Sequence, residues 1–156
     1  MSERVTPPPS RGGDRDPALL GHWSSAPFDL GAMESSDLAF LADGRGWSVL
    51  ASASGSLSVT RFGWSCPAEG VLELRERWYA EGDWSVESGT LEAVRESGPA
   101  TGTLRTAYAL DGEALRFAEP VEFASAYARG SREAAAEQDP SYGFAPDESA
   151  LNGGYS

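Results

Sequence analysis

The sequence predicts an all-β fold: an up-and-down antiparallel barrel of about eight strands, with disordered tails at both ends. Three observations predict it. Apolar and polar residues alternate with a period of two across the middle of the chain. Turn signals rich in Gly and Asp separate the alternating runs about every 10 to 15 residues, as in a meander of hairpins. No long amphipathic helix competes, since only 131–138 could form a short helix and it has no apolar face to dock.

Composition divides the 156 residues into three parts. Residues 1–17 and 131–156 consist mainly of Pro, Gly, Ser, Ala and charged residues, which bury too little apolar surface to fold. We therefore expect a flexible N-terminal tail over 1–17, a barrel over 18–130, and an acidic, mostly disordered C-terminal tail over 131–156. A chain of this length fits a single domain.

The predicted strands follow one another through short turns. In chain order they are 19–25, 37–42, 46–53, 57–66, 71–80, 84–95, 103–110, 114–118 and 121–129. The predicted turns are Asp43-Gly44-Arg45-Gly46, Ser54-Gly55-Ser56, Pro67-Ala68-Glu69-Gly70, Glu81-Gly82-Asp83, Ser97-Gly98-Pro99 and Asp111-Gly112. Gly and Asp favour the backbone conformations that tight hairpins require.

Alternation also predicts which side chains point into the barrel, because residues two apart share a face of a strand. One face of the predicted strand 71–80 carries Leu72, Leu74, Glu76 and Trp78, and we expect this face to point inward. In the strand 57–66 the apolar positions change phase near Arg61. A β-bulge near Arg61 or Gly63 would explain that change.

The first and last strands carry a recognisable pair of signals. Gly21-His22-Trp23 opens the barrel and Arg129 lies near its end. With the meander between them, this pattern resembles the lipocalin-like barrels of the calycin superfamily, including small bacterial members. In that family the Trp plugs the closed end and the Arg packs across it. The resemblance implies structural roles for Gly21, Trp23 and Arg129, and a ligand site at the opposite end.

Composition argues against several partners and cofactors. A net charge of −12, from 24 acidic and 12 basic residues, repels nucleic acid and anionic membranes. One Cys and one His cannot supply a disulfide or the usual zinc ligands, so we expect no metal and no cofactor. Secreted lipocalins carry signal sequences and disulfides, and their absence here favours a cytoplasmic location.

Aromatic side chains with polar tips often line small-molecule sites, although the same rings can simply fill a core. The residues we expect to bind a ligand are Phe40, Trp47, Trp64, Glu76, Trp78, Tyr108 and Tyr127. Glu76 is also a candidate catalytic acid, because burial among apolar neighbours would raise the pKa of its carboxyl group. If the strand slips by one residue, Glu76 instead lies outside beside Arg75 or Arg77. Paired acids close in sequence, such as Glu73 with Glu76 or Glu119 with Glu122, share no inward face.

Three functions from different classes are compatible with these residues. The first is non-catalytic binding of a small apolar or aromatic molecule inside the barrel. The second is an enzyme of specialised metabolism, of cyclase or isomerase type, in which Glu76 assists a positioned substrate. The third is an acidic module that binds a protein partner through its charged surface or through the C-terminal tail, where Tyr142, Phe144 and Tyr155 lie among acidic residues.

Overall fold

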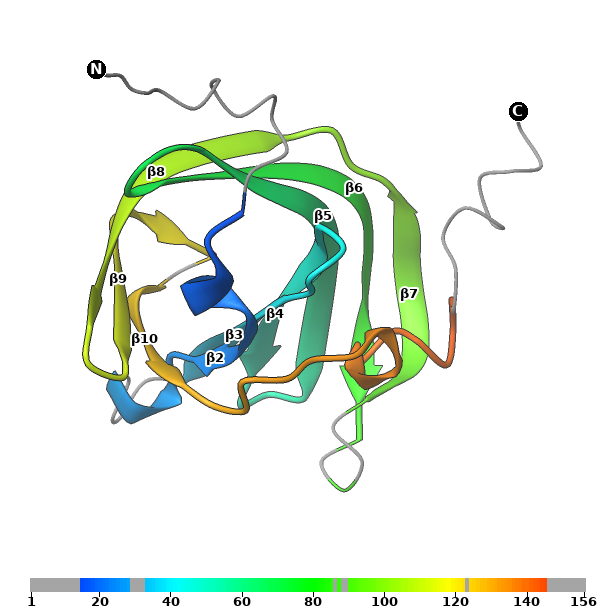
Figure 1. The fold of residues 1–156 in the computed structure, drawn as a ribbon. Coiled ribbons are helices and arrows are strands. Elements are labelled where there is room, and N and C mark those ends of the chain that lie inside the picture. The colour runs from blue at the N-terminus through cyan, green and yellow to red at the C-terminus, as the bar shows by residue number, and fades with distance from the viewer. Residues whose placement is uncertain (1–14, 29–32, 86, 88–89, 123, 146–156) are drawn as a thin grey trace, which may run out of the picture.

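The computed structural model is a closed eight-stranded antiparallel barrel with one further strand beside it (Figure 1), which confirms the predicted fold class. The structure describes residues 15–28, 33–85, 87, 90–122 and 124–145. Most of the predicted N-terminal tail, 1–14, and the end of the predicted C-terminal tail, 146–156, lie outside the described residues.

The eight barrel strands pair in chain order once the one strand that lies beside the barrel is set aside, and pairing of the last strand with the first closes the barrel. The strands are β2 (Gly21–Ser24), β3 (Glu34–Phe40), β4 (Arg45–Ser52), β5 (Ser56–Ala68), β6 (Val71–Trp84), β7 (Leu91–Pro99), β8 (Thr103–Asp111), β9 (Ala114–Val121) and β10 (Ala124–Arg129). Among the described residues the helical elements are short 3-10 turns: η1 (Pro17–Leu19), η2 (Ala26–Phe28) and η3 (Ala136–Gln138).

Strand β6 is shared between two partners. Its first half pairs with β8, from Val71↔Ala107 to Arg75↔Thr103. Its second half pairs with β7, which forms a flap beside the barrel wall (Figure 1). The turns predicted at Glu81-Gly82-Asp83 and Ser97-Gly98-Pro99 are therefore wrong. Both triplets lie within the β6–β7 ladder, because strand pairing overrides the local preference of Gly and Pro for turns.

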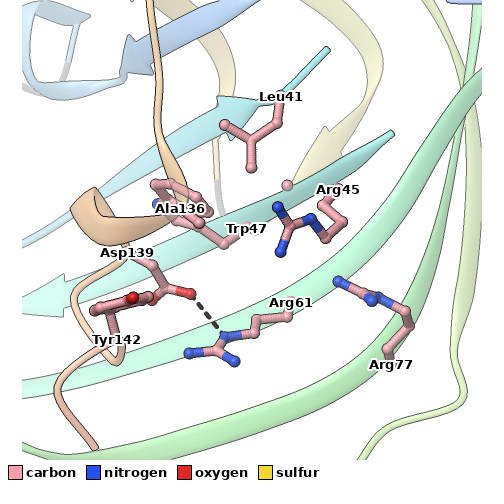
Figure 2. Close-up of a pocket in the computed structure, with 9 residues that line it drawn as sticks. Leu41, Arg45, Trp47, Arg61, Arg77, Ala136, Asp139 and Tyr142 are labelled. Carbon is pink, nitrogen blue, oxygen red and sulfur yellow. Dashed lines mark hydrogen bonds and ion pairs between the residues drawn. The ribbon is translucent and has the colours of Figure 1, made fainter. Parts of the chain in front are cut away.

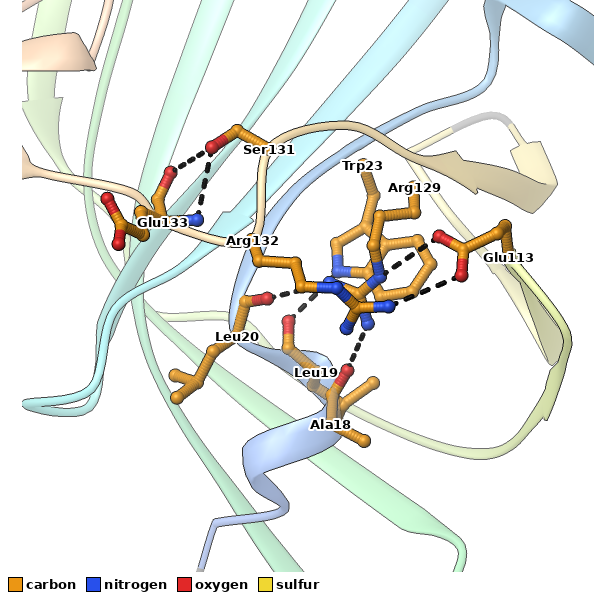
Figure 3. A network of polar contacts seen from close by, with 9 residues as sticks. All are labelled: Ala18, Leu19, Leu20, Trp23, Glu113, Arg129, Ser131, Arg132 and Glu133. Carbon is orange, nitrogen blue, oxygen red and sulfur yellow. Dashed lines mark hydrogen bonds and ion pairs between the residues drawn. The ribbon is translucent and has the colours of Figure 1, made fainter.

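Trp23 and Arg129 close one end of the barrel (Figure 3). The indole of Trp23 is 1% exposed, and its Nε1 donates to the carbonyl of Leu19 at 2.9 Å. The guanidinium carbon of Arg129 lies 4.1 Å from the Trp23 ring centroid, in cation–π geometry. Arg129 also donates to the carbonyl of Leu20 at 2.9 Å and to that of Ala18. These bonds attach η1 and the end of β10 to the plug.

Gly21 permits a close backbone contact at the same end. Its φ of 112° is strained for any side chain, and a Cβ there would lie 2.3 Å from the carbonyl oxygen of Ser131. That carbonyl accepts a hydrogen bond from the backbone N–H of His22 at 2.7 Å, and Gly130 donates back to His22 at the same distance. The chain leaving β10 is thereby held against β2.

Packed side chains fill most of the barrel interior. The buried inner cluster consists of Leu19, Trp23, Leu38, Phe40, Phe62, Trp64, Cys66, Leu72, Leu74, Leu115, Phe117, Val121, Ala124 and Tyr127. Phe40 and Trp64 meet edge to face, with ring centroids 5.0 Å apart. Three residues expected to bind a ligand, Phe40, Trp64 and Tyr127, therefore belong to a close-packed core.

A second core lies on the outer face of β3, β4 and β5. Its buried members are Ala39, Leu41, Trp47, Val49, Leu57 and Val59. Strand β5 thus buries both faces, which accounts for the phase change near Arg61 that the sequence shows. A bulge does occur at this level, but its extra residue is Arg77 on β6, because Arg61 pairs with Trp78 and Phe62 with Glu76.

The expected inward positions of Trp47 and Trp78 are corrected by this arrangement. Trp47 alternates onto the outer face of β4 and packs in the outer core. The bulge reverses the phase of β6, so that Trp78 and Ala80 form a separate buried cluster with Ala145. Neither tryptophan lines the barrel interior.

Residues 131–145, here called the C-terminal segment, cover the outer core (Figure 1). Arg61 Nε bonds Asp139 Oδ2 at 2.7 Å, with both side chains 5% exposed. The Arg61 guanidinium also donates to Ser141 Oγ at 2.9 Å. Its central carbon lies 4.6 Å from the Trp78 ring centroid, in cation–π geometry. The structure thus differs from the predicted tail over 131–145, because a buried ion pair and small apolar residues attach this segment to the barrel wall.

We expect Trp23→Ala to lower the free energy of unfolding by about 3 to 5 kcal/mol, since it leaves a cavity where a buried aromatic ring stood. It also removes the ring on which Arg129 lies. Urea denaturation followed by circular dichroism measures the change. Phe28→Ala is the control, because that ring is 45% exposed. Equal, small losses in both variants would contradict a plug at this end.

We expect Asp139→Asn to destabilise the fold by about 3 to 5 kcal/mol, because it leaves the buried Arg61 without its charged partner. Asp83→Asn is the matched control, since the Asp83 and Arg95 side chains are 61% and 50% exposed. Losing that surface pair should change stability by less than about 1 kcal/mol. The same denaturation experiment compares the two, and a loss for Asp139→Asn no larger than the control would contradict attachment of the C-terminal segment through Arg61.

Candidate functional site

A small pocket lies inside the barrel at the end opposite the plug, and we call it the rim pocket. Its cavity volume is about 60 Å³. Its lining is half apolar and half polar: Ser48, Thr60, Phe62, Leu74, Glu76, Leu104, Val121 and Glu122. The pocket is placed by the β9–β10 turn, where Glu122 lies at the other end of β10 from Arg129.

Strand register brings the polar residues of the rim pocket together. Ser48 on β4 pairs with Thr60 on β5, and Phe62 on β5 pairs with Glu76 on β6. Glu76 is the last residue of the inner face of β6 before the bulge at Arg77. Glu122 reaches the same pocket from the β9–β10 connection, so two carboxylates distant in sequence line one cavity.

Glu122 has an unusual backbone and an unusual carboxyl group. Val121 pairs with Ala124, so Glu122 begins a two-residue hairpin connection, and its φ of 59° is one that Gly, Asn or Asp usually adopts. Its Oε2 accepts a hydrogen bond from Ser48 Oγ at 2.5 Å. Burial raises the pKa of Glu122, the Ser48 hydrogen bond partly offsets this, and the charge of Glu76 raises the pKa further. A strained residue that directs a carboxylate into a cavity is a common feature of functional sites.

Glu76 faces inward at the rim, where it is exposed to solvent. It shares its face with Leu72 and Leu74 as predicted, but the barrel ends before it can be enclosed. Its Oε1 accepts a hydrogen bond from the backbone N–H of Gly102 at 3.2 Å. A Cβ on Gly102 would lie 2.7 Å from that oxygen, so the glycine makes room for the carboxylate.

The other residues expected to bind a ligand lie away from this pocket. The Tyr127 hydroxyl is hydrogen-bonded to Ser36 Oγ at 2.6 Å and donates to the carbonyl of Val121 at 2.5 Å. The Tyr108 hydroxyl donates to Asp16 Oδ2 at 2.6 Å, and burial, followed by this hydrogen bond, raises its pKa. Of the seven predicted residues, Glu76 alone is among those that line the rim pocket.

The sequence predicted a role for Glu76 alone, and the acid pairs that it suggested were Glu73 with Glu76 and Glu119 with Glu122. Glu73 instead points outward, where Arg75 and Arg105 each bond it at 2.7 Å. Glu76 and Glu122 lie in the same pocket because β6 and the β9–β10 turn come together at one end of the barrel. The spacing of residues along the sequence does not predict that proximity. The one local signal at Glu122 is its place in the hairpin between Val121 and Ala124.

The described part of the predicted recognition tail is engaged with the barrel. Tyr142 lines a small cavity beside Arg61 and Asp139, and the ring of Phe144 stacks on Trp78 with centroids 6.4 Å apart. Tyr155 lies outside the described residues.

Comparisons with protein-family models, with curated proteins and with solved structures find no match to this chain. No helix in the described ranges is long and apolar enough to cross a membrane. Within those same ranges, no group of three or more His, Cys, Asp or Glu side chains is arranged to hold a metal ion.

We expect Glu122→Gln to stabilise the protein at neutral pH. The pKa of Glu122 is raised above 4.5 in the fold, so the folded state binds a proton more readily than the unfolded state. The contribution of Glu122 to the free energy of unfolding therefore falls as the pH rises from about 4.5 through the folded-state pKa. Glutamine does not ionise, so the variant does not undergo that fall in stability. The gain should disappear on going below pH 4.5.

Denaturation midpoints measured from pH 4 to 8 test this expectation. Glu119→Gln is the control, since it makes the same change in net charge at an exposed position outside the pocket. An equal gain in stability in both variants, or a gain that does not vary with pH, would show that the fold does not raise the pKa of Glu122.

Proposed function

We propose that the protein binds a small amine-bearing molecule, with its ammonium group between Glu76 and Glu122 in the rim pocket. One observation carries the proposal: two carboxylates from separate parts of the chain line a cavity with an apolar wall. An ammonium group there would interact favourably with both negative charges, and more strongly with that of the buried Glu122 than with that of the solvent-exposed Glu76. Phe62, Leu74 and Leu104 would contact the carbon skeleton of the ligand.

The size of the pocket limits the ligand. Sites for drug-sized molecules usually enclose about 300 to 1,000 Å³, whereas the rim pocket has about 60 Å³. The expected apolar or aromatic ligand is thereby narrowed to a short alkylamine or arylalkylamine, of which the pocket holds only the ammonium group and the carbons next to it, against Phe62, Leu74 and Leu104. The rest of such a molecule would lie at the open rim.

We also propose that the barrel is lipocalin-like. The closed eight-stranded topology, the cation–π plug of Trp23 and Arg129, and a cavity at the opposite end support this relation. Non-catalytic binding in a cup is the role that such a relation favours.

A cyclase or isomerase is the second candidate, favoured by the unequal surroundings of the two acids. Burial raises the pKa of Glu122, while Glu76 is exposed at the rim. Two carboxyl groups with different surroundings can act as acid and base in one site. In this alternative Glu122 donates a proton to the substrate and Glu76 accepts one.

Calorimetric titration with matched probes tests amine binding. We expect hexylamine and benzylamine to bind at pH 8 more tightly than 1-hexanol and benzyl alcohol, which have the same carbon skeletons without the charge. Glu122→Gln and Glu76→Gln should each weaken amine binding by about tenfold, or about 1.4 kcal/mol. Glu119→Gln, which changes the net charge equally, should leave the affinity unchanged.

Two results would contradict the proposal. Alcohols that bind as tightly as amines would mean that the carboxylates do not recognise the ligand. Equal weakening by Glu119→Gln would mean that the amines respond to the overall charge of −12 and not to the rim pocket.

A further inference from the structure

A second concave surface lies on the outside of the barrel near the plugged end, and we call it the arginine groove. Its volume is about 240 Å³. Four arginines and one carboxylate are among its described lining residues: Arg15, Asp43, Arg45, Arg75 and Arg77, around Gly63. The rim pocket shares no lining residue with it.

Strand register builds the groove. Arg45 on β4 pairs with Gly63 on β5, and Gly63 pairs in turn with Arg75 on β6. Residues directly opposite one another share a face, and adjacent strands lie about 4.8 Å apart. The backbones of Arg45 and Arg75, two strands apart, are therefore separated by about 10 Å. Between them Gly63 has no side chain, and a Cβ there would meet only the Gly44 carbonyl oxygen, at 3.7 Å. Backbone without a side chain therefore forms the base of the groove at Gly63, between the side chains of Arg45 and Arg75.

The bulge in β6 adds a third arginine. Arg77 has no opposing residue on β5, and it lies on the outer side with Arg75. Figure 2 shows Arg45, Arg61 and Arg77 extending into one space beside Asp139 and Tyr142. That cavity measures about 20 Å³, room for a single water molecule. Arg45 and Arg77 line both this cavity and the groove, so five of the 12 basic residues of the chain lie around two adjoining hollows.

Ion pairs hold two of these arginines and leave part of each guanidinium available. Arg45 Nε bonds Asp43 Oδ2 and Arg75 Nε bonds Glu73 Oε2, each at 2.7 Å. Hydrogen bonds from Arg75 and Arg105 lower the pKa of Glu73, which therefore stays ionised and keeps Arg75 in place. In the described part of the chain the side-chain ion pairs of Arg45 and Arg75 use Nε, and a guanidinium has four further N–H donors on its Nη atoms.

We infer that the arginine groove binds a small polyanion, a molecule with two or more phosphate or carboxylate groups. Guanidinium groups pair with both chemistries through two parallel hydrogen bonds. The spacing across Gly63 suits a ligand that presents one anionic group to Arg45 and another to Arg75. Since a protein of net charge −12 repels anions at long range, saturable binding of a polyanion requires a local site of this kind.

Titration of the full chain with pyrophosphate and with citrate, at constant ionic strength, tests the inference. We expect saturable binding of one molecule per chain. The double variant Arg45→Gln/Arg75→Gln should weaken binding at least about tenfold. Arg95→Gln/Arg116→Gln is the control. It removes the same charge, and the side chain of Arg95 is 50% exposed and paired with an aspartate, as that of Arg45 is. Neither control residue lines the groove.

Amide chemical shifts locate the site independently of affinity. Pyrophosphate or citrate should shift the Gly44 and Gly63 amides, and whichever probe binds identifies phosphate or carboxylate as the recognised chemistry. If the double variant does not fold, the single variants Arg45→Gln and Arg75→Gln should each reduce affinity severalfold. Absence of saturable binding by both probes, equal loss in the control, or shifts confined to the rim pocket would overturn the inference.

Discussion

A one-residue bulge in β6 determines which side chains of this strand face the barrel interior and which face outward. The β5–β6 register skips Arg77, so the inner face of β6 ends at Glu76 and the outer face continues at Trp78. The bulge consequently places a carboxylate at the rim, an arginine in the groove, and a tryptophan beneath the C-terminal segment. Bulges commonly redirect side chains in this way near functional sites.

The wall from β3 to β6 buries apolar residues on both of its faces. Apolar residues on both faces require cover on both sides, and residues 131–145 supply the outer cover. Arg61 and Asp139 form a buried pair whose desolvation is compensated by further bonds to Ser141 and by the Trp78 ring. Two carboxylates thus line the rim pocket at the open end, while four arginines gather in the groove near the plugged end.

The sequence predicted the barrel and most strand positions, because period-two alternation and turn residues are local signals. It misplaced Trp47 and Trp78, since alternation cannot detect an inserted residue and since β5 buries both faces. It missed that Glu76 and Glu122 line one pocket, because their proximity depends on long-range strand register. It predicted a disordered tail over 131–145, where attachment depends on one ion pair, on alanines and on the stacking of Phe144 on Trp78, and not on an apolar stripe.

The most direct test of this account is a carbon-detected NMR titration of the Glu122 carboxyl, with and without hexylamine. A rim pocket that holds two interacting carboxylates predicts a raised pKa for Glu122 in the free protein, because burial and Glu76 both oppose its ionisation. An ammonium group between the two acids should lower that pKa again. An ordinary glutamate titration that hexylamine leaves unchanged would contradict both the pocket and its proposed ligand.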